Sequence, residues 1–289
     1  MKEVKNNNFS FKVNELGAEL KSLTCDGLEY IWCSDPKFWK RSAPFLFPIV
    51  GSIKDSKTII NGKEYVLTQH GFLRDQEFTT VLHTDKKIVL ENKYSEETLK
   101  KYPFKYKAVI TYEIIDESLK TSINISNVGD EVMPFNLGGH PAFNCPLYAN
   151  DTFEDYTVYF EKPETFGSPE VVSGGLLNFN NPVYSLENAE KIELKKDLFT
   201  IDTILIPNVQ SKKIKLLNKD NKGIEFSYPE FSTLAIWTPY NEAPFVCLEP
   251  WIGYNDKHDT NGEYLTKDDL VKLNPNKEFN ASYTIKIIK

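Results

Sequence analysis

Short runs of alternating apolar and polar residues dominate the chain. The alternation is strongest from Tyr106 to Ile115 and from Leu119 to Val128, on the two sides of a polar turn. Successive side chains of an extended chain point to opposite faces, so such runs predict strands with one buried and one exposed face. Similar runs lie at 9–13, 20–24, 58–60, 63–67, 77–94, 212–217, 224–228, 233–237, 245–248 and 282–288. The pattern predicts many short antiparallel strands.

Turn and helix signals agree with this class of fold. Asn61-Gly62 predicts a tight hairpin, because both residues adopt the positive φ angles of a type I′ turn. Helix signals are few: a turn from Ser34 to Trp39, another from Ser95 to Lys101, and a helix from Lys267 to Leu273 capped by Thr266. None is long enough to cross over a parallel sheet. The chain is therefore predicted to be all-β, a large antiparallel β-sandwich with a few short helices.

The stretch from Tyr148 to Lys196 carries clusters of Pro, Gly and Asn. We expect a loop-rich excursion there rather than a second folding unit. No repeat of fixed period appears, which disfavours propellers and solenoids. A single domain over residues 1–289 is expected.

Composition narrows the possible partners. The 289 residues carry a net charge of -7, from 34 basic and 41 acidic residues, without a long basic block, so nucleic acid is not an expected partner. The four cysteines form no C-x-x-C pair and are expected to be reduced, mostly packed thiols. The start of the chain is polar, and no stretch approaches the ~18 apolar residues of a membrane span. A soluble cytoplasmic protein with no membrane partner is expected.

Three polar residues follow turn or strand signals and are candidates for chemistry: His70, His140 and Glu249. His140 lies between Gly138-Gly139 and Pro141, in a segment that makes a poor strand and a poor helix. We expect its ring to be presented rather than packed, although a hydrogen-bonded, partly buried loop histidine is the alternative.

Two acidic residues stand among apolar ones. Glu249 follows an apolar run and precedes Pro-Trp, an environment that could raise its pKa toward that of a useful general base; the alternative is an exposed glutamate at a strand end. Asp202 interrupts a very apolar run, where an unpaired charge would be costly, so a structural pairing and a role in the site are both open. His83 and His258 are assigned no role in chemistry.

Taken together and in order, five motifs resemble the aldose 1-epimerase, or galactose mutarotase, family over nearly the whole chain. They look most like its bacterial branch often encoded beside lactose and tagatose phosphate genes. The motifs are Arg41-Ser42-Ala43-Pro44 running into Phe47-Pro48-Ile49-Val50-Gly51, Asn61-Gly62-Lys63-Glu64-Tyr65, Gln69-His70-Gly71-Phe72-Leu73-Arg74-Asp75, Gly139-His140-Pro141-Ala142-Phe143 and Cys247-Leu248-Glu249-Pro250-Trp251.

The resemblance implies a galactose mutarotase-like supersandwich and an isomerase that interconverts the anomers of a hexose or hexose phosphate. Glu249 would be the base at the anomeric hydroxyl and His140 the acid at the ring oxygen, on opposite sides of the sugar ring. His70, Asp202 and Trp237 would hold the sugar. The resemblance implies neither a metal nor an organic cofactor, and we expect a monomer or a homodimer.

The sequence departs from the family at one position. Ser52 stands where the family usually carries a sugar-binding arginine, which weakens the case for efficient turnover unless Lys54 or Arg74 reaches in instead. Arg41, Lys54 and Arg74 neighbour motifs and could favour a 6-phosphate. A catalytically weak carbohydrate-binding or regulatory protein on the same fold is therefore the alternative. A glycoside hydrolase or lyase would need paired carboxylates, for which only Glu249 and Asp202 are available.

Overall fold

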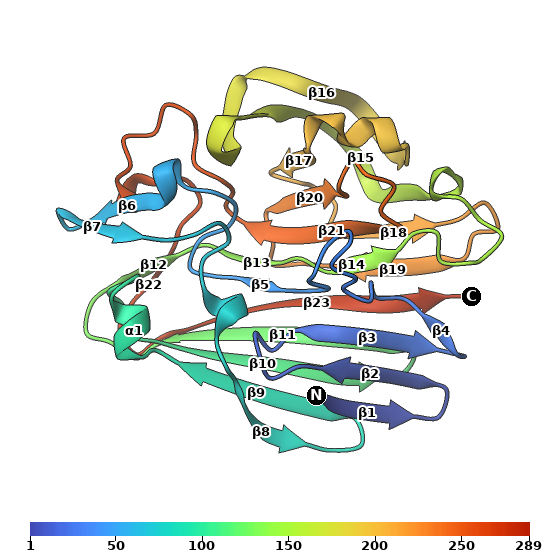
Figure 1. Ribbon diagram of the computed structural model, residues 1–289, viewed down its shortest axis with the longest axis horizontal. Helices are drawn as coiled ribbons and strands as arrows, with labels where there is room; N and C mark the ends of the chain where they lie inside the picture. Colours follow the sequence, from blue (N-terminus) through green and yellow to red (C-terminus); the bar gives the residue numbers. More distant parts are fainter.

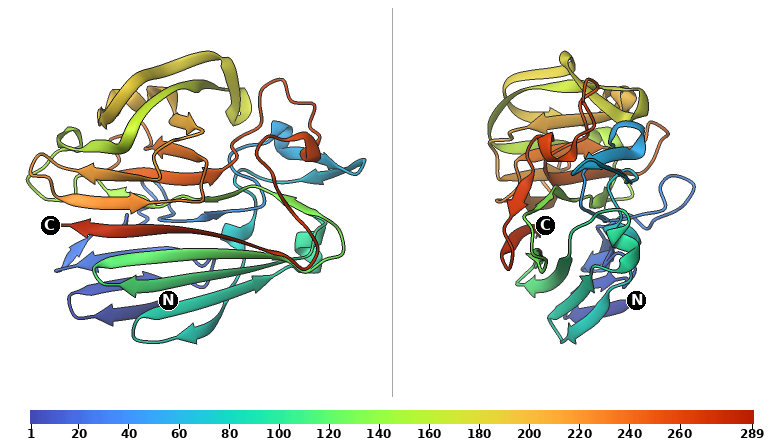
Figure 2. Two further views of the ribbon diagram at one scale, coloured as in Figure 1. Left: turned by 180° about the vertical axis from the view of Figure 1, so that it is seen from behind. Right: turned by 90° about the vertical axis from the view of Figure 1, so that its left-hand side faces the viewer.

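Two large antiparallel sheets dominate the computed structural model, which describes residues 1–289 (Figure 1). The larger sheet has nine strands in the order β16-β15-β18-β19-β23-β11-β10-β9-β8. In chain order these are β8 (Thr79–His83), β9 (Lys87–Lys93), β10 (Tyr106–Ile115), β11 (Ser118–Asn127), β15 (Thr157–Val172), β16 (Leu176–Glu193), β18 (Lys213–Leu217), β19 (Gly223–Ser227) and β23 (Glu278–Ile288). The view from behind in Figure 2 shows β23, β11 and β10 side by side.

The second large sheet positions the pocket described below. Its members are β17 (Thr203–Pro207), β20 (Thr233–Trp237), β21 (Phe245–Ile252), β13 (Leu137–Gly139) and β5 (Phe45–Leu46), in that order, with β14 (Ala142–Asn144) also paired to β21. The smaller sheets are formed by β1 (Lys2–Asn6), β2 (Phe9–Val13), β3 (Leu20–Cys25) and β4 (Leu28–Glu29); by β6 (Lys57–Ile60) and β7 (Lys63–Val66); and by β12 (Met133–Phe135) and β22 (Val271–Leu273).

Helical segments are short. The α-helical segment α1 (Glu96–Leu99) begins after Ser95, whose side chain accepts a hydrogen bond from the backbone of Thr98, as the capping signal predicted. The remaining segments are 3₁₀ turns: η1 (Lys54–Ser56), η2 (Leu73–Asp75), η3 (Phe153–Asp155), η4 (Ser173–Gly175), η5 (Lys196–Ile201) and η6 (Tyr264–Thr266). None of them has the length and apolar character needed to span a membrane. The predicted antiparallel β-sandwich with few helices is confirmed.

Side chains of the buried strand β21 alternate between the two faces of its sheet. In β21, Val246, Leu248 and Ile252 join a cluster of 65 buried apolar residues, whereas Cys247 and Trp251 belong to smaller clusters on the other face. The period of two along a strand causes this division. The six-stranded sheet therefore turns one face to the main core and leaves the other face to line a site.

The Asn61-Gly62 hairpin is confirmed as β6 and β7, with φ angles of 50° and 75° at the turn. Two other predictions were wrong. The stretch from Tyr148 to Lys196 contains β15 and β16, a long hairpin that arches over β17 and β20 in Figure 1. Register shifts interrupt its pairing, which explains why its sequence lacks clean alternation.

The predicted helix from Lys267 to Leu273 does not form. Thr266 ends η6, and Val271–Leu273 instead pairs with β12. Lys267 is buried against Asp256, with 2.8 Å between its Nζ and the carboxylate Oδ1, so tertiary contacts override the local helix signal. The turn before Trp39 forms, but Asp35 rather than Ser34 caps it, by accepting the backbone N–H of Lys37.

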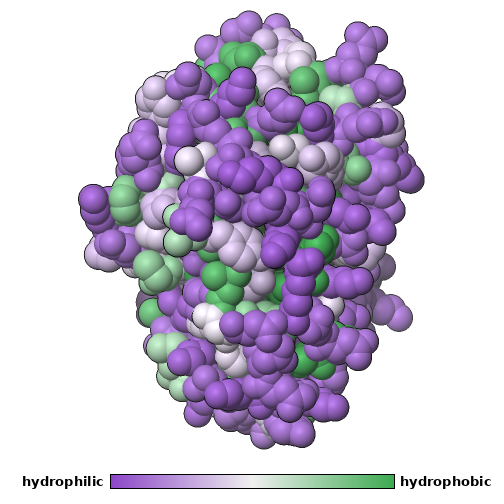
Figure 3. Space-filling model, turned by 90° about the vertical axis from the view of Figure 1, so that its right-hand side faces the viewer, coloured by the Kyte–Doolittle hydropathy of each residue, from purple (hydrophilic) through white to green (hydrophobic).

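The surface is mainly polar. In the face shown in Figure 3 apolar residues form small separate patches among hydrophilic ones. Three of the four cysteines are buried and Cys33 is exposed; all four are free thiols, in agreement with the sequence-based expectation.

Candidate functional site

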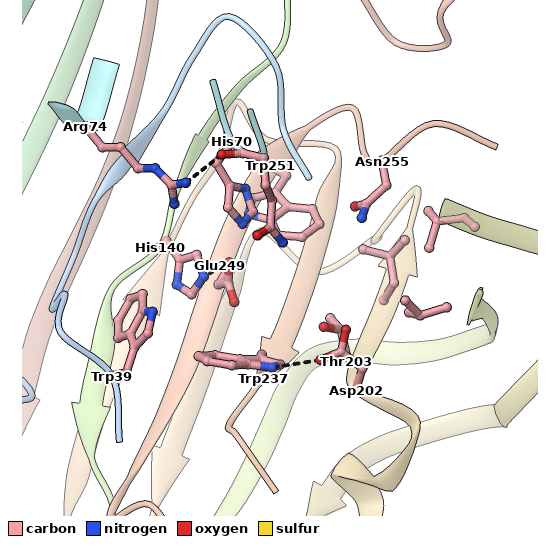
Figure 4. A pocket seen from close by; sticks show the side chains of 14 residues that line it. Trp39, His70, Arg74, His140, Asp202, Thr203, Trp237, Glu249, Trp251 and Asn255 are labelled. Atoms are coloured by element: carbon pink, nitrogen blue, oxygen red, sulfur yellow. Dashed lines mark hydrogen bonds and ion pairs between the residues drawn. The ribbon is translucent and has the colours of Figure 1, made fainter. Parts of the chain in front are cut away.

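A cavity of about 250 Å³ lies on the face of the six-stranded sheet that points away from the main core (Figure 4). Strands β17, β20 and β21 form its floor, and Val171 and Leu177 of the β15–β16 hairpin contribute to its wall. The lining residues are Trp39, Gln69, His70, Arg74, His140, Val171, Leu177, Asp202, Thr203, Leu205, Trp237, Glu249, Trp251 and Asn255. Three tryptophans and several hydrogen-bonding groups therefore surround one small space.

Glu249 lies in the middle of β21 rather than after its end, so the expectation of a strand-end position was wrong. It pairs with Ala235 of β20, and its side chain is 2% exposed. Alternation along the strand places Glu249 and Trp251 on the cavity face. A rigid central strand thus holds this carboxyl group.

His140 lies in a break between β13 and β14, as Pro141 predicted, whereas Gly138 and Gly139 belong to β13, so the prediction of a poor strand was wrong for them. The side chain of His140 is 8% exposed, and its ring stacks on Trp39, with ring centroids 4.7 Å apart. The expectation of a presented rather than packed ring was therefore wrong in part, because the ring lines the cavity yet is buried in its wall. Gly138 lets the Trp251 ring pack close to the backbone of β13, since a Cβ there would lie 2.8 Å from Trp251.

His140 and Glu249 lie side by side. The Nε2 atom of His140 is 3.1 Å from Oε2 of Glu249. Burial lowers the pKa of His140 to about 3, with a further lowering from the nearby Arg74 charge. Burial raises the pKa of Glu249 well above its usual value, and the Asp202 carboxylate adds to this rise. Both groups therefore favour their neutral forms.

His70 occupies a tight turn next to Gly71. Its Nδ1 accepts the backbone N–H of Gly51 at 3.0 Å, and burial lowers its pKa well below the usual value, so the ring is neutral and its proton is on Nε2. His70 lines the cavity as a hydrogen-bond donor. Gly71 has a φ of +71°, and a Cβ there would lie 2.2 Å from the backbone oxygen of Phe47.

Asp202 and Trp237 line the opposite end of the cavity (Figure 4). The indole N–H of Trp237 donates to Oδ1 of Asp202 at 3.1 Å. Burial raises the pKa of Asp202, and this hydrogen bond opposes the rise. The partner that the sequence analysis required for Asp202 is thus another cavity residue.

Arg74 is the one basic side chain among the cavity residues. It donates to the backbone oxygen of Gln69 at 2.6 Å, while its Nε has no partner. Burial lowers its pKa to about 10, so it remains charged at neutral pH. Four of the eleven buried side-chain polar atoms without a partner belong to cavity residues: Arg74, His140, Glu249 and Trp251. Such atoms are costly unless a ligand satisfies them.

The structure leaves three predicted residues outside the cavity lining. Arg41 forms an ion pair with Asp75, with 2.6 Å between its guanidinium and the carboxylate. Lys54 is exposed. Ser52 lies close to Gly175, since a Cβ at Gly175 would lie 2.7 Å from the Oγ of Ser52. Lys54 and Arg74 were the two residues expected to reach in where the usual arginine is missing. Of these, only Arg74 lines the cavity.

Sequence reasoning did not assign several lining residues to the site. Trp39 and Trp251 carry a detectable signal, because aromatic residues next to motif residues often wall sugar sites. Asn255, Thr203 and the apolar wall residues carry none, since the pairing of distant strands brings them to the cavity.

One cluster could hold a metal ion. Ligand atoms of His140, Cys247 and Glu249 all lie within 4.8 Å of one another, and all three residues are buried. Burial raises the pKa of the Cys247 thiol well above its usual value, so the thiol favours its protonated form.

The sandwich and its cavity place the chain among proteins of the galactose mutarotase-like fold. The structure matches that of a galactose mutarotase related enzyme from Lactobacillus acidophilus with a TM-score of 0.93, at 30% identity, over 100% of this chain and 97% of the other. A galactose mutarotase-like protein from Lactobacillus casei gives a TM-score of 0.91 at 30% identity, with full coverage of both chains.

The chain belongs to the aldose 1-epimerase family, whose model matches residues 2–286. The plasmid-encoded protein LacX of Lactococcus lactis subsp. lactis is 32% identical over 295 residues, which covers 99% of each chain. The family resemblance inferred from the motifs is confirmed.

Proposed function

We propose that this protein is an aldose 1-epimerase that interconverts the α and β anomers of a hexose by opening and closing the sugar ring. The observation that carries the proposal is the His140–Glu249 pair, with 3.1 Å between Nε2 and Oε2, in a cavity with unpaired polar atoms. Ring opening removes a proton from the anomeric hydroxyl and adds one to the ring oxygen, so one acid and one base suffice.

The closeness of the pair changes the expected geometry. A separation of 3.1 Å leaves no room for a sugar ring between the two groups, so the expectation of opposite sides was wrong. The two oxygens that exchange protons are both bonded to the anomeric carbon. Adjacent acid and base groups therefore suit this reaction, because together they can reach both oxygens.

We propose that the pair shares a single proton. One member takes the anomeric hydroxyl proton while the other protonates the ring oxygen, and ring closure reverses both transfers. Burial favours this proton on Glu249, so the proton must pass to His140 before Glu249 acts as the base. The Trp39 ring stacked on His140 favours the imidazolium that this transfer creates.

The remaining polar residues would hold the sugar. The free Nε of Arg74 and the Nε2 proton of His70 supply donors, while Asp202 supplies an acceptor. Arg74 provides a guanidinium, the group that Ser52 cannot offer, which favours turnover over binding alone. The faces of Trp237 and Trp251 suit the apolar C–H surface of a hexose.

We propose a neutral hexose rather than a 6-phosphate as the substrate. Of the three basic residues considered for phosphate, Arg41 is paired with Asp75 and Lys54 is exposed away from the cavity lining. Of the three, only Arg74 lines the cavity, and it shares that lining with two carboxyl groups, Asp202 and Glu249. We also propose that residues 1–289 form a single domain, because the main apolar cluster extends from Val4 to Ile287.

Polarimetry of freshly dissolved α-glucose and α-galactose tests this function. We expect the rate of anomer exchange to rise in proportion to protein concentration. A protein that is stabilised by these sugars in a thermal-shift assay but does not accelerate exchange would support the alternative of a carbohydrate-binding or regulatory protein.

A further inference from the structure

Cys247 lies beside the proposed catalytic pair although it does not line the cavity. It is two residues from Glu249 in β21, so both side chains leave the strand on the same face. Its thiol lies within 4.8 Å of the ligand atoms of His140 and Glu249. Trp237 of β20 pairs with Cys247 across the sheet, and the thiol is fully buried.

We propose that His140, Cys247 and Glu249 form a binding site for a borderline-soft divalent cation, with Zn²⁺ as the best fit, and that the bound cation inhibits sugar turnover. Thiolate, imidazole and carboxylate together are a donor set that suits Zn²⁺, whereas Mg²⁺ and Ca²⁺ prefer oxygen ligands alone. None of the functions considered from the sequence gives this cysteine a role.

The spacing of the three ligand atoms is compatible with one ion. Bonds of about 2.0–2.3 Å at tetrahedral angles place two zinc ligands about 3.3–3.6 Å apart. The His140–Glu249 separation of 3.1 Å is close to this spacing, and the bound of 4.8 Å on the thiol requires a side-chain movement of roughly 1 Å at most. Cys247 and Glu249 lie in β21, and His140 lies between β13 and β14. All three strands belong to one sheet, which limits the cost of ordering the site.

A further observation points to a ligand at this place. Oε2 of Glu249 is buried, and although it lies 3.1 Å from Nε2 of His140 it makes no well-aligned hydrogen bond. Because His140 and Glu249 line the cavity, a cation can enter from it, and water can occupy the fourth coordination position on the cavity side.

Charge and proton balance are simple. Binding releases one proton from the Cys247 thiol and one from Glu249 to solvent, and the metal keeps its charge of +2. The thiolate and the carboxylate then neutralise the cation, so no net charge is left in the buried site. A metal bound to His140 and Glu249 prevents both from exchanging protons with a sugar; this inhibition rests on the proposed function, whereas metal binding does not.

Titration of the metal-free full chain with Co²⁺ tests the site without reference to activity. A bound thiolate gives cobalt an intense near-ultraviolet charge-transfer band, and we expect this band to saturate at one equivalent and to disappear when Zn²⁺ is added. Cys247→Ser should abolish the band, and Cys33→Ser, which alters the exposed cysteine, should retain it. No band in the unaltered protein, or a band that survives Cys247→Ser, overturns the proposal.

A second variant guards against a folding defect in Cys247→Ser, which near-ultraviolet circular dichroism would reveal. Glu249→Gln keeps the thiolate, so it should retain the band. Loss of even an outer-shell partner typically weakens metal affinity about 10- to 100-fold, so Glu249→Gln should weaken Co²⁺ binding by at least that factor. Unchanged affinity in this variant would contradict the assigned ligand set.

Inhibition is measured by polarimetry, with each variant normalised to its own metal-free rate. Zn²⁺ should slow anomer exchange competitively with the hexose, and Cys247→Ser should require a Zn²⁺ concentration about 10- to 100-fold higher. Activation by Zn²⁺, or equal inhibition of both proteins, overturns the inhibitory role. A protein with the cobalt band but no anomer exchange refutes the proposed function and leaves the metal site established.

Discussion

Replacing Glu249 by glutamine removes the proposed proton transfer with the least disturbance of packing. Glutamine has nearly the same shape, is neutral and cannot exchange a proton. The native side chain is 2% exposed and favours its neutral form, so the substitution introduces no cavity and no new charge. Any loss of turnover then reports on chemistry rather than on folding.

The size of the loss follows from the role. General acid–base groups typically contribute about 10²- to 10⁴-fold to rate, which corresponds to about 2.7–5.4 kcal/mol of activation free energy. We expect polarimetry to show kcat reduced by this factor. KM should change far less, because Arg74, His70 and Asp202 still hold the sugar.

Stability provides the control, and its sign can be worked out. Burial raises the pKa of Glu249 above 4.5, so above that pH the folded protein retains a proton that the unfolded chain releases. This contribution to the unfolding free energy is complete below pH 4.5 and is lost as pH rises through the raised pKa. Glutamine does not titrate, so Glu249→Gln should be at least as stable as the native protein at neutral pH. Turnover within a few-fold of native, or lost activity with a lower melting temperature, would refute the reasoning.

Four further outcomes are expected. Because burial lowers the pKa of His140 to about 3, the unfolding free energy should fall as pH drops from 6.5 toward 3; His140→Asn should flatten this dependence in urea titrations, and an unchanged slope would contradict the buried neutral ring. Arg74→Met should weaken hexose affinity by about 1.5–3 kcal/mol, whereas Lys54→Met should leave it unchanged, as calorimetry would show. Glucose should bind at least as tightly as glucose 6-phosphate, and its affinity should respond little to salt. Tighter, salt-sensitive binding of glucose 6-phosphate would indicate that the substrate is a sugar phosphate. Gly71→Ala should lower the melting temperature more than Gly62→Ala, since both have positive φ but only Gly71 faces a backbone oxygen, at 2.2 Å; equal effects would exclude the steric argument.

Much of the fold was predictable because local signals agreed with the tertiary structure. The alternating runs became β10 and β11, and Asn61-Gly62 formed its hairpin, because both depend on neighbouring residues alone. The β15–β16 hairpin was missed because its irregular register removes the alternation on which the prediction depends. The Lys267 helix was predicted from a capping residue, but the buried pairing of Lys267 with Asp256 is a contact between chain segments that no local pattern records.

The site was predicted in its residues more than in its geometry. The motifs identified His70, His140 and Glu249, and the structure brings all three to one cavity. The sequence could not show that Glu249 lies within a strand or that it approaches His140 to 3.1 Å, because strand pairing sets both. It also could not separate Arg74 from Lys54, since both follow motif glycines and only the paths of their loops distinguish them.

The central claim is that the adjacent His140–Glu249 pair opens and closes a sugar ring. The most direct measurement is the rate at which pure α-galactose approaches its anomeric equilibrium with the native protein and with Glu249→Gln, at matched concentrations and confirmed folding. The account predicts acceleration in proportion to native protein and a loss of about 10²-fold or more in the variant. Exchange at the rate of buffer alone with native protein, or equal acceleration by both proteins, would contradict it.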